Sequence, residues 1–163
     1  MAEKTQKHGK WILSAAVLLW CVVIWQFSLT PADASSATSG SVRAFLNGIL
    51  TALGIPFQFT PIMVRKIAHF TEFFILGVLL HSALFAHRAP YRIPLAVAGV
   101  VAVATIDECI QRFVPGRAAA VLDVLLDTAG GTAGVLVFWG VFCLVLYIKK
   151  KTAKKSEKIS KTS

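Results

Sequence analysis

Charged residues are scarce in this chain. Of its 163 residues only 15% are charged, with eight acids among them, whereas 56% are hydrophobic and the mean hydropathy is +0.68. Soluble domains contain about 45–50% apolar and about 25% charged residues, and disordered segments contain fewer apolar residues still. So short a chain cannot bury this much apolar surface within itself. The composition therefore excludes a disordered chain and argues against a water-soluble globule, which leaves a small integral membrane protein with one domain.

The chain also lacks the short motifs of several enzyme classes. It contains no HExxH, no G-x-S-x-G and no C-x-x-C. These absences argue against a zinc protease, a serine hydrolase with a nucleophile elbow and a paired thiol site. We expect Cys21, Cys109 and Cys143 to be small buried apolar residues rather than disulfide or metal partners.

Long apolar runs, in contrast, occur four times. A helix needs about 20 residues to cross a bilayer, and the runs at about 11–29, 67–85, 93–113 and 121–148 are long enough. We therefore predict an all-α membrane protein, a bundle of four transmembrane helices. Residues 1–10 and 149–163 are expected to form tails outside this transmembrane domain.

The first apolar run has an alternative interpretation as a cleaved signal peptide. Ala32-Asp33-Ala34 follows a basic start and an apolar core, as a signal-peptide cleavage site does. The apolar core of about 18 residues exceeds the about 7–15 residues of a signal peptide, however. We therefore favour a retained first span.

The net charge of +9 would suit a nucleic-acid-binding protein, but the positions of the basic residues indicate a membrane. Twelve of the 17 lie in the two tails and in the loop after the second span: Lys4, Lys7, Lys10, Arg88, Arg92, Lys149, Lys150, Lys151, Lys154, Lys155, Lys158 and Lys161. The other face has Arg43, Arg65, Lys66, Arg112 and Arg117. Because Lys and Arg accumulate on the cytoplasmic side, we predict that both termini are cytoplasmic. We expect the tails to contact anionic lipid headgroups and expect no nucleic-acid partner.

The outer loop between the first two spans is expected to contain a short helix. Residues 31–40 are rich in Ser, Thr and Ala, which predicts a flexible turn. Apolar residues then recur with helical spacing over about 41–53: Val42, Phe45, Leu46, Ile49, Leu50 and Leu53. Gly54 and Pro56 should end this helix. It either lies on the outer leaflet or packs on the bundle, and the sequence favours neither.

The carboxylates within the spans are the most informative residues. A charged side chain in a transmembrane helix costs about 2.5–3.5 kcal/mol on insertion scales, so it faces the bundle interior and finds a partner. Five acids lie at the outer ends of the last three spans: Glu72, Asp107, Glu108, Asp123 and Asp127. At 1.5 Å per residue, Glu72, Asp107 and Asp127 lie about 8–9 Å below the outer surface. We therefore predict that they meet at one level.

Further polar residues share helix faces with these acids. Arg65, His69 and Glu72 have i, i+4, i+7 spacing, and Gln111 follows Asp107 by four residues. A tight turn at 115–116 should bring the last two spans together. The predicted ligand-binding pocket comprises Arg65, Lys66, His69, Glu72, Asp107, Glu108, Gln111, Arg112, Arg117, Asp123 and Asp127. The alternative is that these pairs only hold helices in register, most simply for Asp123 and Arg112.

Metal binding is weakly indicated. His69-x-x-Glu72 reverses the Glu-x-x-His element of di-iron bundles and occurs once, without a second histidine at that level. We therefore expect no metal and no other cofactor. The sequence contains no feature that defines an oligomeric state.

Four segments together resemble the VanZ-like family of small bacterial membrane proteins. They are residues 66–73 (KIAHFTEF), 107–113 (DECIQRF), 115–117 (PGR) and 123–128 (DVLLDT). Their order on separate spans makes the likeness specific, and it covers most of the chain. Asp127 stands where we expect Asn in many members, and Gly131 where we expect Ala.

The resemblance implies a four-helix protein of the bacterial cell membrane, linked to lowered sensitivity to glycopeptide antibiotics, teicoplanin in particular. It implies no mechanism. Three hypotheses follow for the predicted pocket. It binds an anionic lipid or lipid-linked cell-wall precursor; it is an intramembrane enzyme site; or it relays protons in a carrier. In the enzyme, His69 would be base or nucleophile, Glu72 would orient it, and Asp107 or Glu108 would be acid or base.

Overall fold

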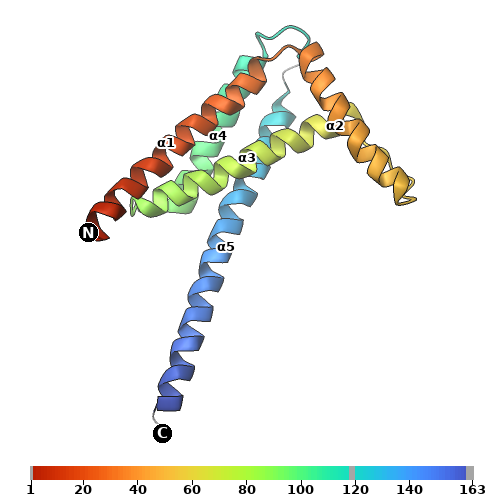
Figure 1. The fold of residues 1–163 in the computed structure, drawn as a ribbon. Helices are drawn as coiled ribbons and strands as arrows, with labels where there is room; N and C mark the ends of the chain where they lie inside the picture. Colours follow the sequence, from red (N-terminus) through yellow and green to blue (C-terminus); the bar gives the residue numbers. More distant parts are fainter. Residues whose placement is uncertain (1, 118–119, 161–163) are drawn as a thin grey trace.

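The described residues form five helices, four of which are long and apolar enough to cross a membrane. The computed structural model describes residues 2–117 and 120–160, with side chains for residues 8–31, 39–117 and 120–153. The helices are α1 (Ala2–Leu29), α2 (Ala32–Ala52), α3 (Pro61–Ala86), α4 (Arg92–Gln111) and α5 (Val121–Ser160). Helices α1, α3, α4 and α5 are long and apolar enough to span a bilayer (Figure 1). The predicted all-α membrane fold is confirmed.

Helix α3 is the centre of the bundle. It contacts each of the other four helices, and most extensively α5. Figure 1 shows that the α1–α2 and α4–α5 connections lie at one end of the bundle, whereas the two chain termini lie towards the opposite end. Residues 27–30, 61–72, 107–117 and 120–127 therefore gather at the end away from the termini.

The hydrophobic core lies between α1, α3 and α4. Ile24, Phe73, Leu76 and Val100 are fully buried and pack together. Most other large apolar side chains of the spanning helices face outwards, as expected for helices surrounded by lipid. Cys21 belongs to the core, but the expectation of burial is wrong for the two other free cysteines, which are exposed.

Helix α3 begins six residues earlier than the predicted span. The Thr60 side chain caps the helix by accepting a hydrogen bond from the backbone N–H of Met63 at 3.2 Å, and Pro61 occupies the first turn. The apolar run predicted a start at Ile67, because the intervening charges suggested loop. The cap instead places Arg65 and Lys66 on the helix.

The remaining helix limits also differ from the sequence-based prediction. Helix α4 ends at Gln111 instead of residue 113, and α5 continues through the predicted tail to Ser160. Residues 32–40 are helical, so the predicted flexible turn there is wrong. The Ser- and Ala-rich composition was interpreted as a loop, although Ala is the strongest helix former.

Helix α2 leaves the bundle instead of covering it (Figure 1). Its predicted apolar stripe stays open, since Val42, Phe45, Ile49 and Leu53 are 44–69% exposed. The helix ends where Gly54 adopts φ +69°, as the sequence indicated. An uncovered apolar stripe suits the lipid surface better than packing on the bundle.

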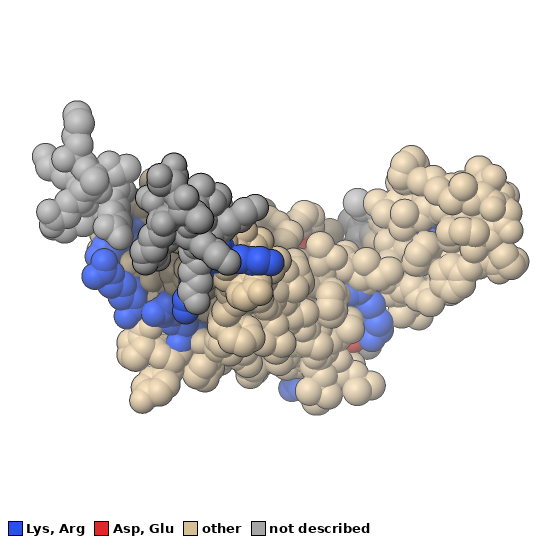
Figure 2. Space-filling model, turned by 90° about the horizontal axis from the view of Figure 1, so that it is seen from below, with Lys and Arg blue, Asp and Glu red and all other residues tan. Residues whose placement is uncertain are grey.

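Viewed from the end that bears the termini, the molecule is mainly uncharged (Figure 2). Lys and Arg side chains gather on part of this end, and very little Asp or Glu is visible.

Glycines on α5 allow its backbone to lie against α3. A Cβ atom on Gly130 or Gly134 would overlap the carbonyl oxygen of Phe70 or Phe74, and one on Gly77 would overlap the backbone of α5. Such close approach is typical of small residues at membrane helix interfaces. The segment from Gly130 to Gly134 is therefore a close helix contact, and it brings the beginning of α5 to the polar part of α3.

We predict that Gly134→Ala lowers the free energy of unfolding by about 1–3 kcal/mol, because the added methyl group overpacks the interface. Thermal unfolding of the purified protein in detergent measures the effect. Gly140→Ala is the matched control on the same helix, since a Cβ there meets open space. Equal stabilities of the two variants would contradict the close contact.

Candidate functional site

A polar cavity lies at the bundle end away from the termini. It has a volume of about 100 Å³ and is bordered by α3, α5, the end of α4 and the α4–α5 connection. Its lining residues are Ile62, Arg65, Lys66, His69, Gln111, Arg117, Asp123, Leu126 and Asp127. We call this space the polar cavity. Seven of its lining residues belong to the pocket predicted from the sequence.

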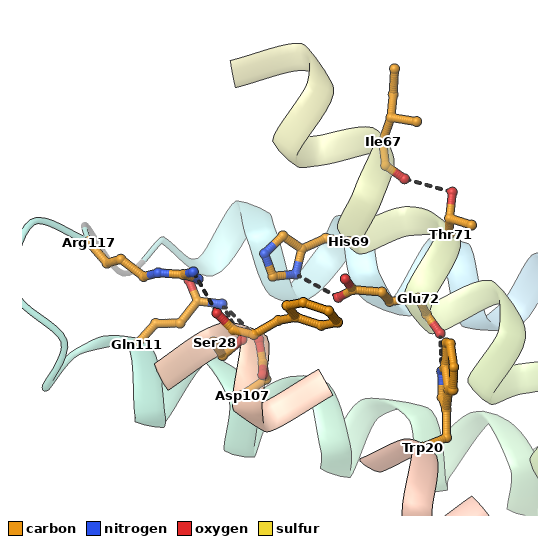
Figure 3. Close-up of polar contacts among 10 residues, drawn as sticks. Trp20, Ser28, Ile67, His69, Thr71, Glu72, Asp107, Gln111 and Arg117 are labelled. Atoms are coloured by element: carbon orange, nitrogen blue, oxygen red, sulfur yellow. Dashed lines mark hydrogen bonds and ion pairs between the residues drawn. The ribbon is translucent and has the colours of Figure 1, made fainter. Parts of the chain in front are cut away.

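Asp107 is held beside the polar cavity by a hydrogen-bond network that joins α1 to α4. Its side chain is fully buried. The Gln111 Nε2 group donates to Asp107 Oδ2 at 2.7 Å and to Ser28 Oγ at 3.2 Å (Figure 3). Asp107 Oδ1 has no hydrogen-bond partner among the described residues. The network therefore fixes the carboxylate and leaves one oxygen for another interaction.

His69 and Glu72 face each other on α3. Their Nδ1 and Oε2 atoms are 3.9 Å apart, and both side chains are mostly buried (Figure 3). Neither atom has a hydrogen-bond partner among the described residues. The Trp20 Nε1 group donates to the backbone carbonyl of Glu72 at 2.9 Å, which ties this turn of α3 to α1.

Side chains from three helices converge at the inner part of this region. One ligand atom each of His69, Asp107 and Asp127 lie within 4.8 Å of one another. Asp127 is 3% exposed, and its Oδ1 atom also has no hydrogen-bond partner in the described part of the chain. The structure thus brings together one residue each from α3, α4 and α5.

Arg117 closes the polar cavity from the α4–α5 connection. Pro115 and Gly116, with φ +76° at Gly116, form a turn closed by a hydrogen bond from Arg117 N to Val114 O. The guanidinium donates to Phe27 O at 2.8 Å and Thr30 O at 3.2 Å, while Nη1 is buried without a partner among the described residues. Burial lowers the pKa of Arg117 from its ordinary value, as does Arg65 nearby. Arginine nevertheless remains charged.

Lys66 and Asp123 form an ion pair at the rim. The Nζ and Oδ1 atoms are 2.8 Å apart, and their side chains are 47% and 34% exposed. An exposed pair of this kind contributes about 0–1 kcal/mol. It connects α3 to α5, as the simpler interpretation of Asp123 anticipated.

Four of the predicted pocket residues do not line the polar cavity. Asp107 lies beside it, as described above. Arg112 is exposed at the end of α4, Glu108 is buried elsewhere on α4, and Glu72 lines an adjoining groove instead. The structure therefore separates Arg112 and Glu108 from the polar cavity itself.

Sequence analysis did not identify an apolar groove beside the polar cavity. This space of about 430 Å³ runs between the end of α1, α2 and α3. Its lining residues are Phe27, Thr30, Ser39, Val42, Leu46, Val64, Arg65, Ile67, Ala68, His69 and Glu72. We call it the lateral groove. Arg65 and His69 line both spaces, so the groove and the cavity adjoin.

Ser28 and Trp20 are further residues that sequence analysis did not assign to the site. Each supports it from α1 through a hydrogen bond to α4 or α3. The first span contains no charge after Lys10, so nothing in its sequence indicated contact with polar groups.

Fold and site together define a four-span α-helical membrane protein with a polar site inside one end of its bundle. The family model described as VanZ/LLP1 matches residues 13–147, which include every site residue. The chain therefore belongs to this family. No curated protein and no solved structure matches the chain.

We predict that Gln111→Leu lowers the free energy of unfolding by about 1–3 kcal/mol, because it leaves the Asp107 carboxylate and Ser28 unpaired in a buried position. Removing the carboxylate as well, in Asp107→Leu/Gln111→Leu, should recover part of this loss. Thermal unfolding in detergent measures both effects.

Arg112→Gln is the control for this experiment, since Arg112 is the exposed neighbour of Gln111. The buried network would be refuted if Gln111→Leu and Arg112→Gln were equally stable.

Proposed function

We propose that this protein binds an anionic lipid or a lipid-linked cell-wall precursor through its polar cavity and lateral groove. A phosphate group of the ligand occupies the polar cavity, and its apolar chain lies in the lateral groove. The anionic lipid and the lipid-linked precursor are chemically alike, because both carry phosphate on a long hydrocarbon chain.

The half-buried guanidinium of Arg117 is the observation that carries this proposal. Its Nη1 atom has no hydrogen-bond partner among the described residues, although Nε and Nη2 are held by the end of α1. Arg65 and Lys66 line the same cavity. Cationic donors fixed in this way suit a phosphate oxygen, with which they form charge-assisted hydrogen bonds.

The junction of the two spaces supports a lipid over a free phosphate. Arg65 and His69 border both the cavity and the groove. The groove walls are mainly apolar, with Val42 and Leu46 from α2 facing Val64 and Ile67 from α3. A ligand with a charged head and an apolar tail satisfies both environments at once.

We place the site in the outer leaflet, with both termini in the cytoplasm. The excess of Lys and Arg near the termini supports this orientation. In this orientation α2, with its exposed apolar stripe, lies at the outer membrane surface beside the groove.

We predict that Arg117→Gln and Arg65→Gln each weaken binding of phosphatidylglycerol by about tenfold or more, because hydrogen bonds to charged groups contribute about 1.5–3 kcal/mol. Native mass spectrometry of the purified protein, titrated with phosphatidylglycerol or with phosphatidylcholine, measures this affinity. Inorganic phosphate serves as the competitor that lacks an apolar chain.

Arg112→Gln is the matched control, since it removes one exposed positive charge outside the polar cavity. Arg65→Gln keeps the test decisive if Arg117→Gln fails to fold. Equal binding by all three variants would refute the proposed phosphate site.

An enzyme is the second candidate, favoured by the buried pair of His69 and Glu72. In such an enzyme His69 accepts a proton and Glu72 orients its ring. Analysis of the lipids after the same incubations separates the two candidates. If a product forms with the wild-type protein and not with His69→Gln, while both bind the lipid, the protein is an enzyme. If the lipid stays intact in every incubation, it is a binding protein.

In the cell, we propose that occupation of the site modulates the envelope and lowers sensitivity to teicoplanin. We predict that expression of the wild-type chain in a sensitive bacterium raises the inhibitory concentration of teicoplanin, whereas expression of Arg65→Gln does not. Growth assays with matched protein levels measure this difference. If both chains raised the inhibitory concentration equally, resistance would not depend on the phosphate site.

A further inference from the structure

We infer that His69, Asp107 and Asp127 form a binding site for one divalent transition-metal ion, for which Mn²⁺ and Zn²⁺ fit the ligands best. We call this the three-helix metal site. The inference deepens the proposed function, since the site adjoins the cavity proposed for the phosphate group, but metal binding itself does not require the lipid.

The ligand atoms are already close to coordinating distance. One donor atom each of His69, Asp107 and Asp127 lie within 4.8 Å of one another. Bonds of about 2.0–2.2 Å to a shared ion place neighbouring ligand atoms about 3–4 Å apart. Small side-chain rotations therefore complete the site without moving a helix.

Two of the three side chains are buried with an unsatisfied oxygen. Asp107 is 0% and Asp127 is 3% exposed, and the Oδ1 atom of each has no hydrogen-bond partner among the described residues. A buried carboxylate oxygen without a partner is strongly unfavourable. A bound cation removes this penalty for both carboxylates together.

The local charge balance also favours a cation. Asp127 is close enough to four other carboxylates to be repelled by their charges: Asp107, Asp123, Glu72 and Glu108. Asp123 is paired with Lys66. The Arg117 guanidinium is close enough to Asp107 and Glu72 to interact with them electrostatically, but it donates its hydrogen bonds to carbonyl groups of α1. The inner carboxylates are therefore left without a directly bonded cation among the described residues.

The surrounding structure supports the ligands as in known metal sites. Gln111 donates to Asp107 Oδ2 and is itself linked to Ser28 of α1, so Oδ1 keeps its direction. Hydrogen bonds of this kind orient metal ligands and tune their affinity. Glu72 Oε2, at 3.9 Å from His69 Nδ1, is a third carboxylate oxygen beside the same region.

The donor set selects the class of ion. One imidazole nitrogen and two carboxylate oxygens suit Zn²⁺ and Mn²⁺, whereas soft ions prefer sulfur. His69 and Asp127 also line the polar cavity, so an ion between them is accessible from it. Its remaining coordination positions can accept water or a phosphate oxygen of the proposed lipid.

Binding of Mn²⁺ to the chelator-treated protein in detergent, without added lipid, tests the inference. We expect one Mn²⁺ per chain by titration with electron paramagnetic resonance, and displacement by Zn²⁺. Asp107→Asn and Asp127→Asn should each raise the Kd by about tenfold or more. Asp123→Asn is the comparison variant, because Asp123 lines the same cavity but is paired with Lys66; it should raise the Kd by less than either of these variants.

A spectroscopic measurement keeps the inference testable if an Asp variant fails to fold. Pulsed electron paramagnetic resonance of the wild-type Mn²⁺ complex should show coupling to an imidazole nitrogen, which His69→Gln removes. No bound Mn²⁺ or Zn²⁺, equal weakening by Asp123→Asn and Asp127→Asn, or bound Mn²⁺ without imidazole coupling would each overturn it. The lipid titration is repeated on the chelator-treated protein, so failure here with Arg65-dependent lipid binding intact removes only the metal site.

Discussion

A carboxylate on a membrane-spanning helix has to turn away from hydrocarbon, and this constraint organises the molecule. Asp107 satisfies it by complete burial, with one oxygen held by Gln111 and through it by Ser28 of α1. Asp127 satisfies it by facing α3 and α4 from α5. Each inward-facing acid thus fixes the rotation of its helix, and the polar groups meet because none of them can face the lipid.

The glycines of α5 determine how closely its inward-facing acid approaches α3. Gly130 and Gly134 let the α5 backbone approach Phe70 and Phe74, whose neighbours on α3 include the site residues. Without that contact, Asp127 would face the same region from a greater distance. The glycine packing near the middle of α3 and the polar residues near its beginning are therefore parts of one interface.

Much of this arrangement could be predicted from sequence, because α3, α4 and α5 bear their carboxylates at a common level. Periodicity placed His69 and Glu72 on one face, and the apolar runs predicted four spans. Length of apolar sequence did not predict the start of α3, which the Thr60 cap determines. The sequence also did not predict the roles of Ser28 and Trp20. The hydrogen-bond partner of a polar atom in an otherwise apolar helix is defined only when the helices pack. A metal site built from three helices is hidden for the same reason.

The central claim is that His69, Asp107 and Asp127 meet inside the bundle. An experimental structure of the protein in a lipid nanodisc, with the separations between these three side chains measured, tests it most directly. The account predicts that their ligand atoms lie together, within about the 4.8 Å found here. A structure in which any one of the three faces lipid, or is separated from the other two by an intervening helix, would contradict it.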